Sequence, residues 1–270
     1  METERIGLIG CGEMGSALAR GIVTKGGIKP SAVYVYDLNK EREALLATEL
    51  QSITAESLEM IAQQCRFLFI AVKPQDAGSL LDSIKSLVRP DQIIISIAAG
   101  ITVSFIEKYL PEGTKVIRLM PNTPCLIGEG VVVISTGTTV TDDERKEVEK
   151  LLKPLGLIIR FPETLMDAAT GLSGTGPAYV YLFIETMIDA GVSIGIRRDV
   201  ASKLVVQNVI GAAKMLERDT HHPAEMRNIV TSPAGTTSSA MLVLEESGFR
   251  SCLIKAVIAA TKRSKELLRG

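Results

Sequence analysis

The sequence predicts an α/β region built on a doubly wound sheet, followed by an all-α C-terminal region. Residues 5–15 join a short apolar strand to a glycine-rich turn and a helix-favouring segment. Strand and helix patterns then alternate as far as residue 161, and beyond residue 162 only helical patterns rich in Ala, Leu and Met remain. Such alternation is typical of a parallel sheet covered by helices on both faces. We therefore expect domains at residues 1–162 and 163–270.

The glycine-rich turn has the spacing of a dinucleotide-binding loop. Gly10, Gly12 and Gly15 form G-x-G-x-x-G between strand and helix. This pattern provides a tight turn, close backbone approach to a pyrophosphate and close packing of helix on strand. Asp37 ends the next apolar strand, about 20 residues later, where such folds place an acid on the ribose. We expect a Rossmann-type nucleotide site here, the alternative being a purely structural turn.

Composition excludes several other classes of function. The 270 residues are 46% hydrophobic and 23% charged, as in ordinary globular proteins. A net charge of -1 without basic runs argues against nucleic acid as a partner. The apolar runs are too short to span a bilayer, and the first strand starts too early for a signal peptide, so we expect no membrane association and a cytoplasmic protein. Four scattered cysteines indicate no metal site.

Further candidate ligand contacts lie at the ends of the later strands. Lys73-Pro74 follows the apolar run 66–72, and a small-residue turn at 98–100 follows the strand 92–97. Open α/β sheets bind ligands at the carboxyl ends of their strands. Lys73 is therefore either a ligand contact or an ordinary solvated lysine.

The C-terminal region reads as a set of helices. The expected ranges are Pro177–Gly191, Asp199–Leu216, Ala224–Val230, Thr236–Glu246 and Arg250–Leu268. The first of these is apolar on most sides and needs more cover than one layer of helices gives. An interleaved homodimer would supply that cover.

Two glycine- and hydroxyl-rich turns are expected to interrupt these helices, at Thr170–Pro177 and Thr231–Ser239. The second opens directly onto a helix, where free N–H groups, hydroxyls and the helix dipole favour an anion. The alternative is simple helix capping by Ser and Thr.

Six motifs in order give the chain a specific family resemblance. They are G-C-G-E-M-G, A-V-K-P-Q, S-I-A-A-G-I-T, M-P-N-T-P, G-L-S-G-T-G-P-A-Y and S-P-A-G-T-T. Together they resemble pyrroline-5-carboxylate reductase. The resemblance implies reduction of Δ1-pyrroline-5-carboxylate, a small-molecule imino acid, to L-proline by NAD(P)H. It also implies a homodimer with its active site at the interface, and dimers often assembled into rings.

The resemblance also assigns roles to residues of this chain. The cofactor-binding residues would be Ile9, Gly10, Cys11, Gly12, Glu13 and Met14 at the pyrophosphate, with Gly15 closing the same loop, and Ala71, Val72, Lys73, Pro74, Ile97, Ala98 and Ala99 at the nicotinamide. The substrate carboxylate would be held by Ser232, Gly235, Thr236 and Thr237. Thr237 would be the catalytic residue, contacting the ring nitrogen or donating a proton. The reaction needs orientation more than a strong base, so no histidine is required.

Three sites depart from the family pattern, one of them Ser238-Ser239, where the family usually has more apolar residues. Ala234 stands where a glycine is common, which requires a negative φ at this residue. Asp37 stands where many relatives carry Ser or Asn, and it would repel a 2′-phosphate at 4 Å by about 4 kcal/mol at a dielectric constant of 20. Lys40 and Arg42 would offset part of this repulsion. We expect NAD(P)H as cofactor, with a preference for NADH.

Three alternatives remain open at this point. The enzyme could reduce another cyclic imino acid, because the turn recognises a carboxylate more plainly than a ring size. The β-hydroxyacid dehydrogenases and imine reductases share this domain order, but the helix after Gly176 lacks the lysine that those dehydrogenases use. A non-catalytic dinucleotide-binding regulator is the third alternative, suggested by Ala234, Ser238 and Ser239 in the substrate turn.

Overall fold

The computed structural model describes residues 4–218 and 221–267. It divides into two compact units. The residues up to Thr175 and those from Ala260 onward form the first unit, and Gly176–Ala259 form the second. The segment 163–175, expected in the C-terminal domain, is thus part of the first compact unit.

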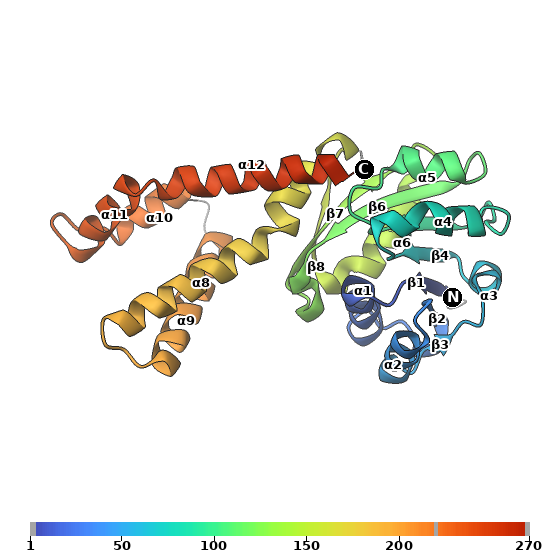
Figure 1. The fold of residues 1–270 in the computed structure, drawn as a ribbon, viewed down its shortest axis with the longest axis horizontal. Helices are drawn as coiled ribbons and strands as arrows, with labels where there is room; N and C mark the ends of the chain where they lie inside the picture. Colours follow the sequence, from blue (N-terminus) through green and yellow to red (C-terminus); the bar gives the residue numbers. More distant parts are fainter. Residues whose placement is uncertain (1–3, 219–220, 268–270) are drawn as a thin grey trace. The chain divides into compact units, whose positions relative to one another are not determined.

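An eight-stranded sheet organises the first unit (Figure 1). Its strands are β1 (Ile6–Ile9), β2 (Val33–Tyr36), β3 (Ile53–Thr54), β4 (Phe67–Ile70), β5 (Ile93–Ser96), β6 (Lys115–Pro121), β7 (Gly130–Thr136) and β8 (Gly156–Arg160). Their order in the sheet is β3-β2-β1-β4-β5-β6-β7-β8. β2 and β3 lie on one side of β1, and β4 and the later strands lie on its other side. In open α/β sheets, ligands bind at the carboxyl ends of the strands where the order reverses in this way, here between β1 and β4.

Helices cover both faces of this sheet. They are α1 (Glu13–Thr24), α2 (Lys40–Leu50), α3 (Leu58–Gln64), α4 (Pro74–Ile84), α5 (Val103–Tyr109), α6 (Asp142–Leu152) and the short α7 (Met166–Ala169). In β4, Phe67 and Phe69 pack into a cluster with α1, α2 and α6, whereas Leu68 and Ile70 pack into a second cluster with α3, α4 and α5. Burial on both faces explains why the strand reads as a continuous apolar run. The expected Rossmann-type fold is confirmed.

The last two strands, β7 and β8, run opposite to β1–β6. β7 is antiparallel to β6, while the other neighbouring pairs are parallel. Between them lies only a short link containing the 3-10 segment Thr123–Ile127. A parallel crossover needs a dozen or more residues, so a link of this length returns the chain antiparallel.

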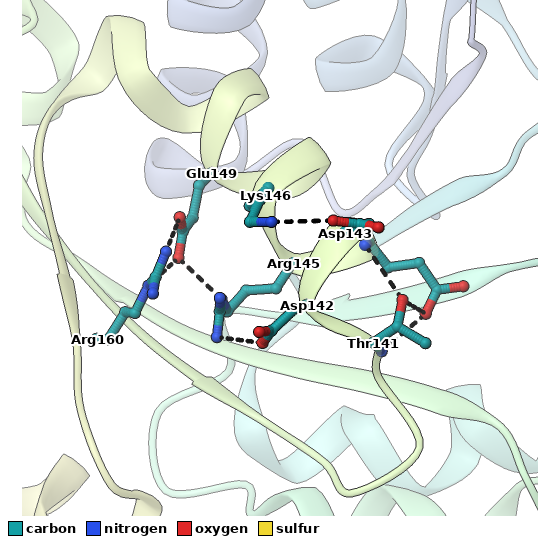
Figure 2. A network of polar contacts seen from close by, with 8 residues as sticks. Thr141, Asp142, Asp143, Arg145, Lys146, Glu149 and Arg160 are labelled. Carbon is teal, nitrogen blue, oxygen red and sulfur yellow. Dashed lines mark hydrogen bonds and ion pairs between the residues drawn. The ribbon is translucent and has the colours of Figure 1, made fainter.

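A network of charged side chains joins α6 to the edge strand β8 (Figure 2). Arg160 on β8 donates from Nε and Nη2 to the two carboxylate oxygens of Glu149 on α6, at 2.7 and 2.9 Å. These bonds hold the pKa of the Glu149 carboxyl below its ordinary value. Arg145 also pairs with Glu149, at 3.3 Å, and Thr141 with Glu144 forms a capping box at the start of α6.

The prediction that a turn at Thr170–Pro177 interrupts the helices is wrong. Thr170–Gly174 is a π-helical turn that follows α7 directly, and α8 begins at Gly176. The N–H of Thr175 donates to the carbonyl of Thr170 at 2.9 Å, and the Thr175 hydroxyl donates to the same oxygen at 3.1 Å. The hydroxyls of Thr170 and Thr175 therefore donate to carbonyls of a widened helix, where the sequence suggested that the segment interrupts the helices.

The second unit is helical, as expected. Its helices are α8 (Gly176–Ser193), α9 (Arg198–Arg218), α10 (Pro223–Ile229), α11 (Thr236–Glu246) and the part of α12 (Phe249–Leu267) that precedes Ala260. α8 and α9 pack as a helical hairpin (Figure 1), and the backbone of Gly191 closely approaches Ala201. No helix in the described part of the chain is long and apolar enough to cross a membrane.

Candidate functional site

The glycine-rich loop is shaped by close contacts with the end of β4. Gly10 has φ +106°, and a Cβ there would lie 2.6 Å from the carbonyl oxygen of Ala71. A Cβ on Gly15 would overlap the carbonyl oxygen of Gly10. Only glycine fits these two positions, whereas a Cβ on Gly12 would meet no atom within 4 Å. The loop is thus closed against the sheet and open on the side of Gly12.

The open side leads to the N-terminus of α1. Gly12 is the N-cap of α1 and offers no side chain to its free N–H groups. An adjoining cavity of about 320 Å³ is lined by Cys11, Gly12, Glu13, Ser16, Arg20, Arg42, Leu45 and Leu46. Uncapped N–H groups at the positive end of a helix are suited to a pyrophosphate. The residues present therefore fit a dinucleotide.

Asp37 directly follows β2 and contacts this loop. Its Oδ2 accepts a hydrogen bond from the N–H of Cys11 at 2.6 Å, and its Oδ1 accepts one from the N–H of Asn39 at 2.8 Å. Burial, helped by the carboxylates of Asp37 and Glu43, raises the pKa of the Cys11 thiol to about 12. Cys11 therefore remains a thiol at neutral pH, and its contribution to the loop is its backbone.

The two segments expected at the nicotinamide follow neighbouring strands. Ala71–Pro74 follows β4, where the N–H of Ala71 donates to Ile9 at 2.8 Å, and Ile97–Ala99 follows β5. Because β1, β4 and β5 are adjacent and parallel, the structure brings both segments to the same sheet edge as the glycine loop. Lys73 is exposed and precedes α4 as its N-cap.

The expected substrate turn lies in the second unit. Gly235 is the N-cap of α11, and a Cβ at this position would overlap the Ser232 hydroxyl. The Ser238 hydroxyl donates to the carbonyl of Gly235 at 2.8 Å. No side chain caps the N–H groups at the start of α11. Among the described residues, the Thr237 hydroxyl has no hydrogen-bond partner in the protein. The turn thus leaves donors free, as an anion site requires, whereas the capping alternative would fill them.

The expectation of a negative φ at Ala234 is wrong. Its φ is +56°, in the left-handed region, and not negative. The backbone of the turn therefore keeps the conformation that glycine favours even though the residue has changed.

Sequence reasoning missed Glu43. This residue lies in α2 and is 5% exposed. Its Oε2 accepts a hydrogen bond from the N–H of Asp37 at 2.9 Å and pairs with the Lys40 ammonium at 2.7 Å. The sequence of α2 is polar and gives no indication that one of its acids is buried. The only pattern that points to Glu43 is its spacing of three residues from Lys40, which allows an ion pair on one helix face.

Comparisons with known proteins agree with this architecture. Residues 163–267 match the family model for pyrroline-5-carboxylate reductase dimerisation, and residues 5–100 match the model for NADP oxidoreductase coenzyme F420-dependent. The chain is 40% identical to a pyrroline-5-carboxylate reductase of Methanosarcina acetivorans over 99% of both chains. It is 36% identical to that of Escherichia coli, again over 99% of both.

A solved structure extends the likeness to three dimensions. The pyrroline carboxylate reductase of Plasmodium falciparum, described with NADP bound, superimposes with a TM-score of 0.91 at 35% identity, and the match covers 99% of both chains. The expected resemblance is confirmed: this chain belongs to the pyrroline-5-carboxylate reductase family.

Proposed function

We propose that this chain carries out the reaction of its family, the reduction of Δ1-pyrroline-5-carboxylate to L-proline by NAD(P)H at the last step of proline biosynthesis. The observation that carries the proposal is the full-length similarity to named reductases. Two further features support it. The glycine loop has the shape that a pyrophosphate needs, and the turn before α11 has free donors for a carboxylate.

We assign cofactor binding to the sheet edge of the first unit. The loop Ile9–Gly15 holds the pyrophosphate, Asp37 accepts a ribose hydroxyl, and Ala71–Pro74 with Ile97–Ala99 lines the nicotinamide. When bound, the reduced nicotinamide supplies the hydride. The contribution of these residues is to fix the orientation of the transfer and to keep water away from it.

We assign substrate binding to the turn before α11. Ser232, Gly235, Thr236 and Thr237 hold the carboxylate through N–H groups and hydroxyls, with about 0.3–1 kcal/mol from the helix dipole. A protonated cyclic imine is already electrophilic, so the protein does not need a strong base. Thr237 contacts the ring nitrogen with its hydroxyl and is the residue placed to donate a proton there.

NADH is the preferred cofactor in this proposal. The carboxylate of Asp37, 2.6 Å from the Cys11 nitrogen, borders the cofactor loop and would repel a phosphate on the ribose. One relative, the reductase of Plasmodium falciparum, is described with NADP bound. The preference proposed here therefore depends on residues of this chain.

Assembly and location complete the proposal. Residues 1–162 would form the dinucleotide-binding domain, and 163–270 the dimerisation and substrate domain; the dimerisation model, matching from residue 163, supports this boundary. The helices of two chains would interleave as a homodimer, and dimers could assemble into a ring in the cytoplasm.

The decisive experiment measures oxidation of NADH and of NADPH in parallel, with and without Δ1-pyrroline-5-carboxylate. We expect oxidation that depends on the imino acid and is faster with NADH at low cofactor concentration. A much higher kcat/KM with NADPH would contradict the role given to Asp37. Folded protein that binds dinucleotide but oxidises neither cofactor would point to another cyclic imino acid or to a regulator.

A further inference from the structure

The first turn of α2 contains a buried carboxylate that contacts the backbone of Asp37. Glu43 is 5% exposed, and one of its oxygens serves two partners at once. Oε2 lies 2.9 Å from the backbone nitrogen of Asp37 and 2.7 Å from Nζ of Lys40. Glu43 therefore contacts both Asp37, which is expected to face the ribose, and Lys40.

These contacts hold the Lys40 ammonium against α2 and β2, although 59% of the Lys40 side chain is exposed. Its Nζ lies 4.3 Å from the ring centroid of Tyr36, in a cation–π contact, as well as beside Glu43. The Asp37 carboxylate is bonded instead to the N–H groups of Cys11 and Asn39. Lys40 thus neutralises Glu43 and does not pair with Asp37.

The other cations near the loop differ in their partners. Arg20 makes two hydrogen bonds to Glu49, at 2.7 and 2.8 Å. Arg42 lines the cavity beside Gly12, and within the described ranges it makes no ion pair. Among the described cations near the loop, only Arg42 would therefore be free for a 2′-phosphate, because recruiting Lys40 would leave the buried Glu43 charge without its partner.

We propose that Glu43 is a positioning residue for cofactor selection, which fixes Asp37 beside the glycine loop and withholds Lys40 from a 2′-phosphate. This inference rests on the proposed dinucleotide site and deepens it. The preference for NADH then comes from two carboxylates acting together: Asp37 repels the phosphate, and Glu43 removes the cation that would compensate.

The test is a calorimetric titration of the full-length protein with NAD⁺ and with NADP⁺, in the absence of imino acid. Glu43→Gln keeps an oxygen that can accept from the Asp37 N–H but removes the charge that binds Lys40. We expect the Kd for NADP⁺ to fall about fivefold, equivalent to about 1 kcal/mol, while the Kd for NAD⁺ stays within about a factor of two. Equal changes for both cofactors, or an unchanged ratio, would overturn the proposal.

A further variant shows whether Lys40 is responsible. In Lys40→Met/Glu43→Gln the gain for NADP⁺ should vanish, and a gain that persists would contradict the role of Lys40. The double variant removes both charges of the Lys40–Glu43 pair, so its NADP⁺ affinity should equal that of the unchanged protein. A loss of about fivefold in the double variant would place Lys40 on the phosphate and refute the proposal even if Glu43→Gln fails to fold. These affinities do not depend on the identity of the imino acid, so they separate this inference from the proposed reaction.

Discussion

Ala234 holds the substrate turn in a conformation that its side chain disfavours. An L-residue in the left-handed region costs about 1–2 kcal/mol, and φ at Ala234 is +56°. Glycine would remove this strain but would also loosen the unfolded chain by about 0.4–1 kcal/mol. We expect Ala234→Gly to raise the free energy of unfolding by about 0.5–1 kcal/mol, measured by urea denaturation at fixed protein concentration.

The same substitution at a helical position separates the relief of backbone strain from the general effect of replacing alanine by glycine. Ala240 lies within α11, where glycine should lower the free energy of unfolding by about 1 kcal/mol. Opposite signs at the two positions are therefore expected. Destabilisation by Ala234→Gly would show that the left-handed conformation is not what the folded turn requires.

Thr237 is predicted to matter for turnover and not for cofactor binding. Its hydroxyl has no protein partner among the described residues, so Thr237→Ala removes little that stabilises the fold. We expect kcat to fall by at least about 100-fold, as for other lost proton donors. The Kd for NADH, followed by its fluorescence, should stay unchanged. Thr237→Ser, which retains the hydroxyl, is the control and should keep most activity. Full turnover by the alanine variant would remove Thr237 from the mechanism.

At the scale of elements, two glycines of one motif should respond differently. A Cβ at Gly15 overlaps the Gly10 carbonyl where α1 packs on the strand end, so Gly15→Ala should lower the free energy of unfolding by about 1–3 kcal/mol. A Cβ at Gly12 meets no atom within 4 Å. Gly12→Ala should cost less than about 1 kcal/mol of stability, through the N-cap alone, yet weaken dinucleotide binding. Thermal unfolding and NADH titration distinguish these effects, and similar stability losses in both variants would contradict the packing argument.

The contact between α6 and β8 should make stability depend on pH. Arg160 holds the pKa of Glu149 below its ordinary value of 4.5, so the folded state binds this proton less readily than the unfolded chain does. Stability from this group is complete above pH 4.5 and is lost as the pH falls through the folded pKa. Glu149→Gln should therefore lower the free energy of unfolding at pH 7 by about 1 kcal/mol, and the deficit should shrink towards pH 4.

Asp143 offers a control on the same helix. Its carboxylate pairs with Lys146 but is 89% exposed, so Asp143→Asn should leave the free energy of unfolding nearly unchanged. Urea titrations of the three proteins at both pH values test the comparison. A deficit in Glu149→Gln that persists undiminished at low pH would mean that packing, and not charge, is responsible.

Sequence patterns predict a helix or strand best where the burial of its residues follows a regular pattern within that element. β4 and the first three residues of β5 are apolar because both faces of the sheet are covered, and the sequence shows this directly. The antiparallel β7 and the π-turn at Thr170–Gly174 depend on link length and on hydroxyl-to-carbonyl bonds, which glycine-rich composition does not reveal. In the site, the motifs identify the loops, whereas the buried Glu43 becomes visible only once α2 is packed against β2.

At the scale of the whole molecule, the helical unit is incomplete as a single chain. Tyr181 and Leu182 on α8 are 61% and 64% exposed, and further apolar side chains on α9, α11 and α12 are likewise uncovered. Water-exposed apolar surface of this extent is typical of an interface between chains. The match of residues 163–267 to a dimerisation family model also indicates an interface between chains.

Leu182→Glu should consequently disrupt self-association. A carboxylate on α8 would be buried without a partner if a second chain covers this helix, so light scattering should show a shift from dimer or larger assembly towards monomer. Leu45→Glu on α2, where the leucine is 71% exposed, is the control and should leave the mass unchanged. For the unchanged protein, the unfolding midpoint should rise with protein concentration, because association stabilises only the folded chains. An active monomer whose midpoint is independent of concentration would mean that one chain can cover α8 by itself, and the interleaved dimer would be excluded.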